Sequence, residues 1–588
     1  MEQVVVISVI AGLIAVLYMD WMRPVIAFFL AALVMLVSGV IDSKDLMHGF
    51  SNEQIVVVIL LLLLSDIIQR TGALDIVFRN IFNPSISYRS FLARLSTIVT
   101  GISGFVNNTP LVAILMPYVY NWAKKKNISP SKVLIPLSYA TILGGTITLV
   151  GTSTNLVVNG FVTDAGYPSL ELFDFTAAGI VVAAFGAIYL IFIAPLFLPD
   201  RKDALSSFKE KSREYMVETF LKKGSLMIGK TVEEAGLRKL QGLFLVEIVR
   251  GNERIAPVSP RQTLYEEDVL IFAGDTNTIT DLIRSDTGLE LPKYSKLPGE
   301  ENMQVVEVVV SANSDLIGKI VKETNFRGKF DAAIVAINRD GERITGKLGE
   351  VELQSGDLIL LLTGKDFSVR AKNEQDFYII SKVQEVHNIP AWKSIAVIAG
   401  TIFSFVAAAT EWITLFQALL ILMSVIVVIQ VVKFNEIKNS FDVDLYLILV
   451  LALSLGKAIV NTGLDRDIAE RMITLVEPLN SPVAVLACIY LLTNVLAMLV
   501  TNKAAVAIMF PVTIAASVSL ELSYIPFVLA IAFAGSAEFM TPYGYQTNLM
   551  VYGPGGYKFK DYIRVGWGLS LLNMIVVVLM LAWIYNLW

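Results

Sequence analysis

The sequence has few of the residues on which disulfides, metal sites and nucleic-acid binding depend. Among 588 residues there is one cysteine, Cys488, and there are two histidines, His48 and His387, which lie far apart. An internal disulfide is therefore impossible, and a zinc-type site, which needs several clustered Cys or His ligands, is disfavoured. The net charge of −5 argues against nucleic acid as a partner, because phosphate binding needs a basic surface.

Charged residues are scarce as well, and apolar residues replace them. Charged residues make up 17% and hydrophobic residues 55% of the chain, whereas a soluble protein has roughly 25% charged residues. Apolar runs long enough to cross a bilayer occur at 3–19, 24–41, 54–69, 132–161, 174–199, 391–409, 412–432, 443–460, 524–550 and 565–587. The sequence predicts an α-helical polytopic membrane protein with one crossing for each run.

The stretch between the fifth and sixth runs differs in character, with charges every few residues and short alternating apolar segments. We expect a soluble insert there, between a first membrane half at 1–199 and a second at 390–588. Lysine and arginine gather in one set of short loops, for example at 124–126, and acidic residues in the other, for example at 465–477. The positive-inside rule then predicts that the insert is cytoplasmic and that both termini lie outside.

Two further apolar segments, about 90–120 and 483–519, are too long for one crossing and are polar at their centres. The central residues are Asn107, Asn108 and Thr109 in the first segment, and Thr501, Asn502 and Lys503 in the second. We expect both segments to be re-entrant hairpins. Irregular backbone at membrane depth survives only inside protein or beside a wet cavity, so each tip implies a site.

The two halves match each other at a nearly constant spacing. Asn155 and Asn548 differ by 393 positions, as do three neighbouring pairs, and Asn108 and Asn502 differ by 394. An odd number of crossings in each half would invert the second copy relative to the first. Inverted repeats with broken helices are typical of secondary transporters, so we predict two inverted repeats of five crossings.

Lys503 and Glu538 are two of the charges that lie within apolar segments. Lys503 occupies a hairpin tip, where an ammonium group is expensive and therefore a functional candidate. It either binds an anionic substrate directly or stands where a second sodium ion would otherwise lie. Glu538 lies in an apolar helix, and pairing with Lys503 would reduce the cost of burying both charges.

The insert is itself duplicated. Gly229 and Gly318, Arg250 and Arg339, and Asp268 and Asp357 each differ by 89 positions. We expect two small α+β domains, at 200–290 and 291–389. Their duplication favours a ligand-sensing or dimerising module over a passive spacer.

The stretch FMTPYGYQTNLMVY at 539–552 resembles the divalent anion/sodium symporter family of the ion transporter superfamily. The insert resembles two copies of the C-terminal regulatory domain of potassium-conductance regulators, called RCK_C or TrkA-C. The family resemblance implies a homodimer in which the hairpins and broken helices carry substrate past a static scaffold by an elevator movement. A nucleotide is one ligand that the RCK_C-like domains could hold.

The same resemblance assigns residues to ligands, because the family's hairpin-tip motifs touch both sodium and substrate. The first sodium site is expected to comprise Ser103, Asn107, Asn108, Gly151, Thr152 and Asn155. The second, which Lys503 puts in doubt, would use Thr501, Asn502 and Thr541. The residues expected to bind substrate are Asn107, Asn108, Thr109, Thr501, Asn502, Lys503, Thr547 and Asn548.

We therefore expect a secondary active transporter, not an enzyme, that spans the inner or plasma membrane many times. Its substrate is expected to be a small divalent anion, sulfate in preference to a C4-dicarboxylate, with sodium as the coupling ion and a proton as the alternative. Two other hypotheses stay open. A cation/proton antiporter would need an essential carboxylate such as Asp66 or Glu538, and a membrane receptor would signal ligand occupancy through the insert.

Overall fold

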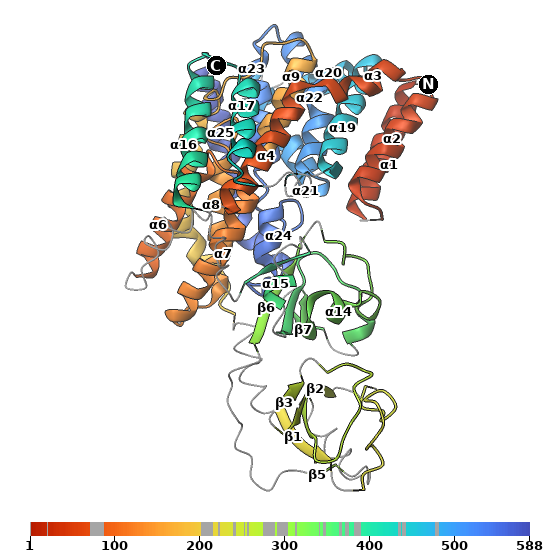
Figure 1. The fold of residues 1–588 in the computed structure, drawn as a ribbon. Helices are drawn as coiled ribbons and strands as arrows, with labels where there is room; N and C mark the ends of the chain where they lie inside the picture. Colours follow the sequence, from red (N-terminus) through yellow and green to blue (C-terminus); the bar gives the residue numbers. More distant parts are fainter. Residues whose placement is uncertain are drawn as a thin grey trace.

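A computed structural model shows a bundle of helices with two small sheets attached at one end (Figure 1). The N- and C-termini both lie at the opposite end of the bundle from the sheets. The structure describes residues 2–19, 21–70, 87–201, 216–221, 224–238, 243–251, 253–255, 258–274, 289–290, 304–311, 314–339, 342–344, 348–363, 367–370, 376–380, 390–432, 437, 441, 443–476 and 481–588.

The first half is helical throughout its described residues apart from short connections. Its helices are α1 (Glu2–Tyr18), α2 (Pro24–Val37), α3 (Ser43–His48), α4 (Glu53–Arg70), α6 (Tyr88–Ser103), α7 (Asn108–Lys125), α8 (Leu134–Gly145), α9 (Ser153–Asp164) and α10 (Thr176–Ile188). A π-helical turn, Tyr189–Ile193, continues α10 into α11 (Ala194–Phe197). Local signals set several starts: Pro24 opens α2, and Asp42 and Asp45 form a capping box on α3.

The second half follows a similar sequence of helices. These are α16 (Ala391–Ala409), α17 (Leu415–Val428), α19 (Val443–Asn461), α20 (Leu464–Val476), α21 (Pro482–Leu499), α22 (Asn502–Ser519), α23 (Tyr524–Ser536), α24 (Gln546–Tyr552) and α25 (Phe559–Ile584). The acidic segment that we expected to be a loop, 465–477, largely forms the helix α20. Apolar residues such as Ala469 and Met472 face the core there, and the acidic residues lie mainly on the other face.

Length and composition agree with a protein that crosses a membrane many times. Within the described ranges, six helices are long and apolar enough to span a bilayer, and the bent pair Ser43–Ser51 with Glu53–Ile68 would make a seventh. Shorter apolar helices, such as α2 and α17, accompany them. Both halves contain a helix pair interrupted near its middle, α8 with α9 and α23 with α24.

The insert forms two antiparallel five-stranded sheets. The first, in the order β3-β2-β4-β1-β5, contains β1 (Met216–Leu221), β2 (Leu243–Arg250), β3 (Glu253–Ile255), β4 (Val269–Gly274) and β5 (Leu289–Glu290). The second, in the order β10-β6-β9-β7-β8, contains β6 (Gln304–Val310), β7 (Ala332–Arg339), β8 (Glu342–Arg343), β9 (Leu358–Thr363) and β10 (Phe377–Ile379), with the short helices α14 (Phe326–Phe330) and α15 (Phe367–Arg370). The second sheet lies next to the helix bundle, and the first lies farther from it (Figure 1).

The two sheets share details at the spacing of 89 residues. Arg250 binds both carboxylate oxygens of Asp268, at 2.8 and 2.9 Å, and Arg339 binds both oxygens of Asp357 at 2.8 Å. A bulge interrupts the pairing of β2 with β4 and of β7 with β9 at equivalent residues. The repeated residues therefore hold the same structural positions in both sheets.

Candidate transport site

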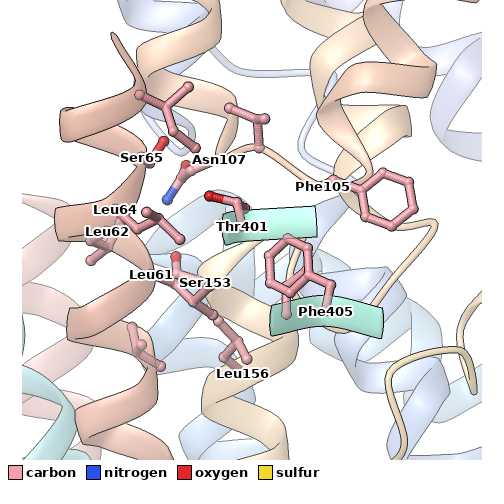
Figure 2. Close-up of a pocket in the computed structure, with 14 residues that line it drawn as sticks. Leu61, Leu62, Leu64, Ser65, Phe105, Asn107, Ser153, Leu156, Thr401 and Phe405 are labelled. Atoms are coloured by element: carbon pink, nitrogen blue, oxygen red, sulfur yellow. The ribbon is translucent and has the colours of Figure 1, made fainter. Parts of the chain in front are cut away.

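The tip expected at Asn107 to Thr109 lies beside the long helices α4 and α16. The chain breaks between α6 and α7, and Asn107 caps α7 by accepting a hydrogen bond from the Thr109 backbone amide at 3.4 Å. A cavity beside this break is lined mostly by apolar side chains such as Leu61 and Phe405 (Figure 2). Its polar lining residues are Asn107, Ser65 in α4, Ser153 in α9 and Thr401 in α16. Because Thr401 is central in α16 and Ser65 lies in the second half of α4, the tip sits well inside the bundle.

Asn108 joins this tip to both broken helices. Its side-chain oxygen accepts a hydrogen bond from the Ser103 hydroxyl at 2.6 Å, and its amide nitrogen donates to the Tyr545 hydroxyl at 2.6 Å. The Tyr545 hydroxyl lies 3.1 Å from the Thr152 hydroxyl. All four side chains are buried, so the expected first-site residues Ser103, Asn108 and Thr152 meet in one hydrogen-bonded network.

Asn155 and Asn548 make the same pair of contacts in their own halves. The Asn155 amide donates to the Thr148 and Gly145 carbonyl oxygens, at 2.9 and 3.4 Å. The Asn548 amide donates to the Thr541 and Glu538 carbonyl oxygens, at 3.0 and 2.7 Å. Each contact in one half thus lies 393 positions from its counterpart. Each asparagine amide bridges two backbone carbonyl oxygens at its own helix break.

Backbone oxygens converge next to Gly151, which we expected in the first sodium site. A Cβ atom at Gly151 would lie 2.6 Å from the Gly145 carbonyl oxygen and 3.0 Å from that of Gly104. Any side chain larger than hydrogen would therefore displace these carbonyls. The buried side-chain oxygen of Asn155 has no hydrogen-bond partner among the described residues. This region consequently offers hard oxygen atoms that can coordinate a cation.

Three hydrogen bonds connect the first half to α24 at or next to residues expected to bind substrate. The Thr109 hydroxyl donates to the Gln546 side-chain oxygen at 3.1 Å. The Ser138 hydroxyl lies 2.9 Å from that of Thr547 and 2.7 Å from the Asn548 side-chain oxygen. Thr547 and Asn548 are fully buried, so they fix the break rather than face open solvent.

The tip expected in the second half is the break between α21 and α22, each of which is long and apolar enough to span a bilayer. This break is arranged differently from the one in the first half. Thr501 caps α22 by accepting a hydrogen bond from the Ala504 amide at 3.3 Å. Asn502 and Lys503 form the first turn of that helix and are half-buried. Among the residues that the structure describes, Asn502 has no hydrogen-bonded link to a break comparable with that of Asn108. The expected second-site residues are therefore less tightly joined than those of the first site.

The expected pairing of Glu538 with Lys503 is wrong. Glu538 is fully buried just after α23, and neither of its carboxylate oxygens has a hydrogen-bond partner within the described ranges. The Thr541 hydroxyl nearby is likewise buried without a partner there. Gly544 makes room for the carboxylate, because a Cβ atom at that position would lie 2.1 Å from one of its oxygens.

Sequence reasoning did not select Tyr545, Gln546 or Ser138. Tyr545 is 393 positions from Thr152, which is the spacing of the other matched pairs. The match is hard to recognise because a tyrosine stands where the first half has a threonine. Ser138 sits in an apolar run, and nothing in the sequence distinguishes it from a packing residue. Only the approach of segments some 400 residues apart reveals its role.

The second sheet contacts the helices that carry the site. Glu307 on β6 is fully buried and accepts a hydrogen bond from the Tyr120 hydroxyl at 3.0 Å, and the Lys124 ammonium lies 3.9 Å away. Gly553, directly after α24, packs against the turn before β9. A Cβ atom added at Gly553 would lie 2.6 Å from the Gly356 carbonyl oxygen in that turn. The insert thus touches both α7 and the chain directly after α24.

Comparison with known proteins places the whole chain among transporters. The model of the family described as "citrate transporter" matches residues 13–415 and 405–587. An uncharacterised transporter of Synechocystis sp. is 30% identical over 99% of this chain and 97% of its own length. Sodium/sulfate cotransporters 2 and 1 of Chlamydomonas reinhardtii are each 22% identical, over 95% and 98% of this chain and 87% and 89% of their own lengths.

Proposed function

From the premise that the chain belongs to the citrate transporter family, and is a multi-pass transporter and not an enzyme, we propose that it moves a small divalent anion with sodium. Sulfate is the preferred substrate and a C4-dicarboxylate the second choice, because relatives that match nearly all of this chain are named sodium/sulfate cotransporters. One observation carries the proposal. Asn108, Thr152 and Tyr545 join a hairpin tip to two broken helices through buried hydrogen bonds.

We infer that the two halves are inverted repeats. Support comes from the matching amide contacts of Asn155 and Asn548, and from the Thr152 and Tyr545 hydroxyls, which lie at equivalent positions and contact each other. The termini lie away from the insert (Figure 1), as an odd number of crossings in each half requires. With the basic loops on the insert side, the insert is cytoplasmic and both termini are outside.

The anion is held by groups that carry or share positive charge. Four helices, α7, α9, α22 and α24, begin at the tips and breaks, and the free amide groups of a helix N-terminus carry about half a positive charge. The side chains of Asn107, Thr109 and Asn502 add neutral donors, and Lys503 adds an ammonium group. This combination suits a dianion of either sulfate or dicarboxylate chemistry.

Sodium binds at the first break. Its ligands are drawn from Ser103, Asn107, Asn108, Gly151, Thr152 and Asn155. The unpartnered Asn155 oxygen and the carbonyls next to Gly151 supply the oxygen-rich surroundings that a hard cation prefers. Elevator movement of the hairpins and broken helices past the remaining helices, in a homodimer, then exposes the site to each side in turn.

The insert regulates this movement. Its second sheet contacts α7 and α24, so a change in the sheet reaches elements that we expect to move. The buried Glu307 to Tyr120 hydrogen bond is the main polar link. Ligand binding by the RCK_C-like domains would alter the transport rate through it.

The test is uptake by proteoliposomes that contain the purified full-length protein. We expect an inward sodium gradient to drive accumulation of labelled sulfate, with weaker accumulation of labelled succinate. Asn155→Ala should abolish sodium-driven accumulation, and Asn159→Ala, which alters an asparagine on the same helix outside the break, should not. Absence of dianion uptake under any ion gradient would refute the proposed function, and sodium uptake driven by an acid interior would favour an antiporter.

A further inference from the structure

Glu538 is a buried carboxyl group with no role in the network described above. It follows α23 directly and is 0% exposed. Both carboxylate oxygens, and the hydroxyl oxygens of Ser536 and Thr541, lack hydrogen-bond partners among the described residues. An ionised carboxylate in such surroundings is strongly disfavoured, and a group of this kind neutralises instead. No hydrogen bond from a described residue stabilises a negative charge on this carboxyl, so the neutral, protonated form is favoured.

The titratable side chains on the elements packed around Glu538 do not neutralise it. Four buried tyrosines use their hydroxyls elsewhere: Tyr139 bonds the Phe539 carbonyl, Tyr490 bonds Asn573, Tyr545 bonds Asn108 and Thr152, and Tyr562 bonds the Asn548 carbonyl. Of these, Tyr545 is near enough to interact electrostatically with Glu538. None of the charged groups on the same elements forms a hydrogen bond with a Glu538 carboxylate oxygen. These groups are Lys503 on α22, Asp164 on α9, Lys124 and Lys125 on α7, and Lys560, Asp561 and Arg564 on α25.

The equivalent position in the first half carries no charge. Gly145 lies 393 positions before Glu538, and a Cβ atom there would lie 2.8 Å from the Asn108 amide nitrogen. The neutral Asn108 side chain therefore fills the space over the first break. In the second half the Glu538 carboxyl fills the space that Gly544 leaves open. One break is thus built around a neutral amide and the other around an ionisable acid.

We propose, resting on the transport function argued above, that Glu538 binds a proton that is transported with each dianion and replaces the second sodium ion. The carboxyl takes one proton from water when the site is open on one side, and releases one proton to water when it is open on the other. Lys503 in the first turn of α22 repels a second metal cation. A proton held covalently in a neutral carboxyl group avoids most of that repulsion.

The proposal predicts the net charge that crosses the membrane in each transport cycle. One sodium ion at the first break and one proton on Glu538 carry two positive charges, which equal the two negative charges of sulfate. Transport is then electroneutral, and a membrane potential should not change the rate of uptake. With two sodium ions and one proton, by contrast, uptake would carry a net positive charge inward.

The experiment uses the full-length protein in proteoliposomes with equal sodium on both sides. We expect an acidic exterior to drive accumulation of labelled sulfate, and a pH dye trapped inside to report one proton entering per sulfate. A gradient of one pH unit corresponds to about a tenfold gain in accumulation per proton. Wild-type protein that accumulates sulfate with a sodium gradient, yet admits no proton, overturns the Glu538 proposal and leaves the transport function standing. No uptake under either gradient overturns both.

Two variants test whether Glu538 is the residue that binds the transported proton. Glu538→Gln should lose the pH-driven gain, with folding checked by its thermal unfolding and by stabilisation with sulfate. Asp66→Asn, which neutralises another acid within an apolar helix, should keep the gain. A folded Glu538→Gln protein that still couples uptake to the pH gradient overturns the proposal. The proposal is also overturned if the wild-type protein admits no proton and Glu538→Gln transports one sodium ion fewer per cycle than the wild type. Glu538 would then be a sodium ligand. If Glu538→Gln does not fold, the wild-type ratio of protons to sulfate decides.

Discussion

The hydroxyl groups of Thr152 and Tyr545, which lie at equivalent positions of the two halves, are 3.1 Å apart inside the helix bundle. Tyr545 also accepts a hydrogen bond from Asn108. One phenol therefore joins the start of α7 to the break between α8 and α9 and to the break between α23 and α24. These groups are buried, and separating them would leave polar atoms without partners, so we expect the three segments to move as one body.

Tyr545→Phe should disrupt this body. The substitution keeps the ring but removes the hydroxyl, leaving the Asn108 amide and the Thr152 hydroxyl without their partner. An unsatisfied buried group costs about 1–3 kcal/mol, so we expect a lower unfolding temperature and at least a tenfold fall in sodium-driven sulfate uptake. Tyr543→Phe is the control, since Tyr543 is largely exposed in the same loop. Equal losses in the two variants would contradict a special role for Tyr545.

Asn108→Ala and Asn502→Ala should both abolish uptake but differ in stability. Asn108 is buried and bonded to Ser103 and Tyr545, so its loss should destabilise the protein by roughly 1–3 kcal/mol. Asn502 is half-buried at the second tip, and its removal should change stability little. Thermal unfolding and uptake, measured on the same preparations, separate the two effects. Wild-type transport in either variant would exclude that asparagine from the site.

The positions of the breaks could be predicted from the sequence because their signals are local. Glycine and threonine cluster between α8 and α9, and threonine, proline and glycine cluster between α23 and α24; such residues disfavour continuous helix. Their spacing of 393 also predicted equivalent roles for Asn155 and Asn548, and the two amides make equivalent contacts. A pattern repeated in one chain thus carries information that a single motif does not.

Contacts between distant segments could not be predicted in the same way. Ser138 and Asn548 are 410 positions apart, and their approach depends on how whole helices pack. The pairing of Glu538 with Lys503 failed for the same reason: both positions were correctly located in apolar segments, but side-chain direction decides which charges meet. The helix α20 was missed because its acidic face concealed an apolar face with helical spacing.

Tyr120→Phe should change transport rate more than substrate affinity. It removes the hydroxyl that donates to buried Glu307, and a hydrogen bond to a charged group contributes about 1.5–3 kcal/mol. Weaker docking of the second sheet on α7 should alter the maximal uptake rate while leaving the half-saturating sulfate concentration unchanged. Glu323→Gln, in the same domain and away from the helices, is the control. An altered affinity with an unchanged rate would place Tyr120 in the substrate site.

Asp376 should make the second sheet sensitive to acid. Burial raises the pKa of this carboxyl, but hydrogen bonds from Lys329 and Ser314 outweigh it and lower the pKa below 3.8. The stabilisation is therefore present above the unfolded pKa and is lost as pH falls through the folded pKa. Limited proteolysis of the full chain, from about pH 5 down to about pH 3, should show increasing cleavage in this domain. Asp376→Asn should be cleaved faster at neutral pH and respond less to acid; equal profiles would contradict the assignment.

Lys503 should set the number of sodium ions that couple to transport. Two unit charges about 4 Å apart interact by about 4 kcal/mol at an effective dielectric constant near 20, which corresponds to nearly a thousandfold in affinity. An ammonium in the first turn of α22 should therefore prevent sodium from occupying the second site. Lys503→Thr restores the residue type of Thr109, which lies at the matching position of the first half. We expect this variant to show a steeper dependence of initial uptake on sodium and a weaker sulfate affinity without sodium. Lys503→Arg, which keeps the charge, should retain the wild-type sodium dependence. Identical Hill slopes and sulfate affinities in wild type and Lys503→Thr would show that Lys503 serves the fold and not the site.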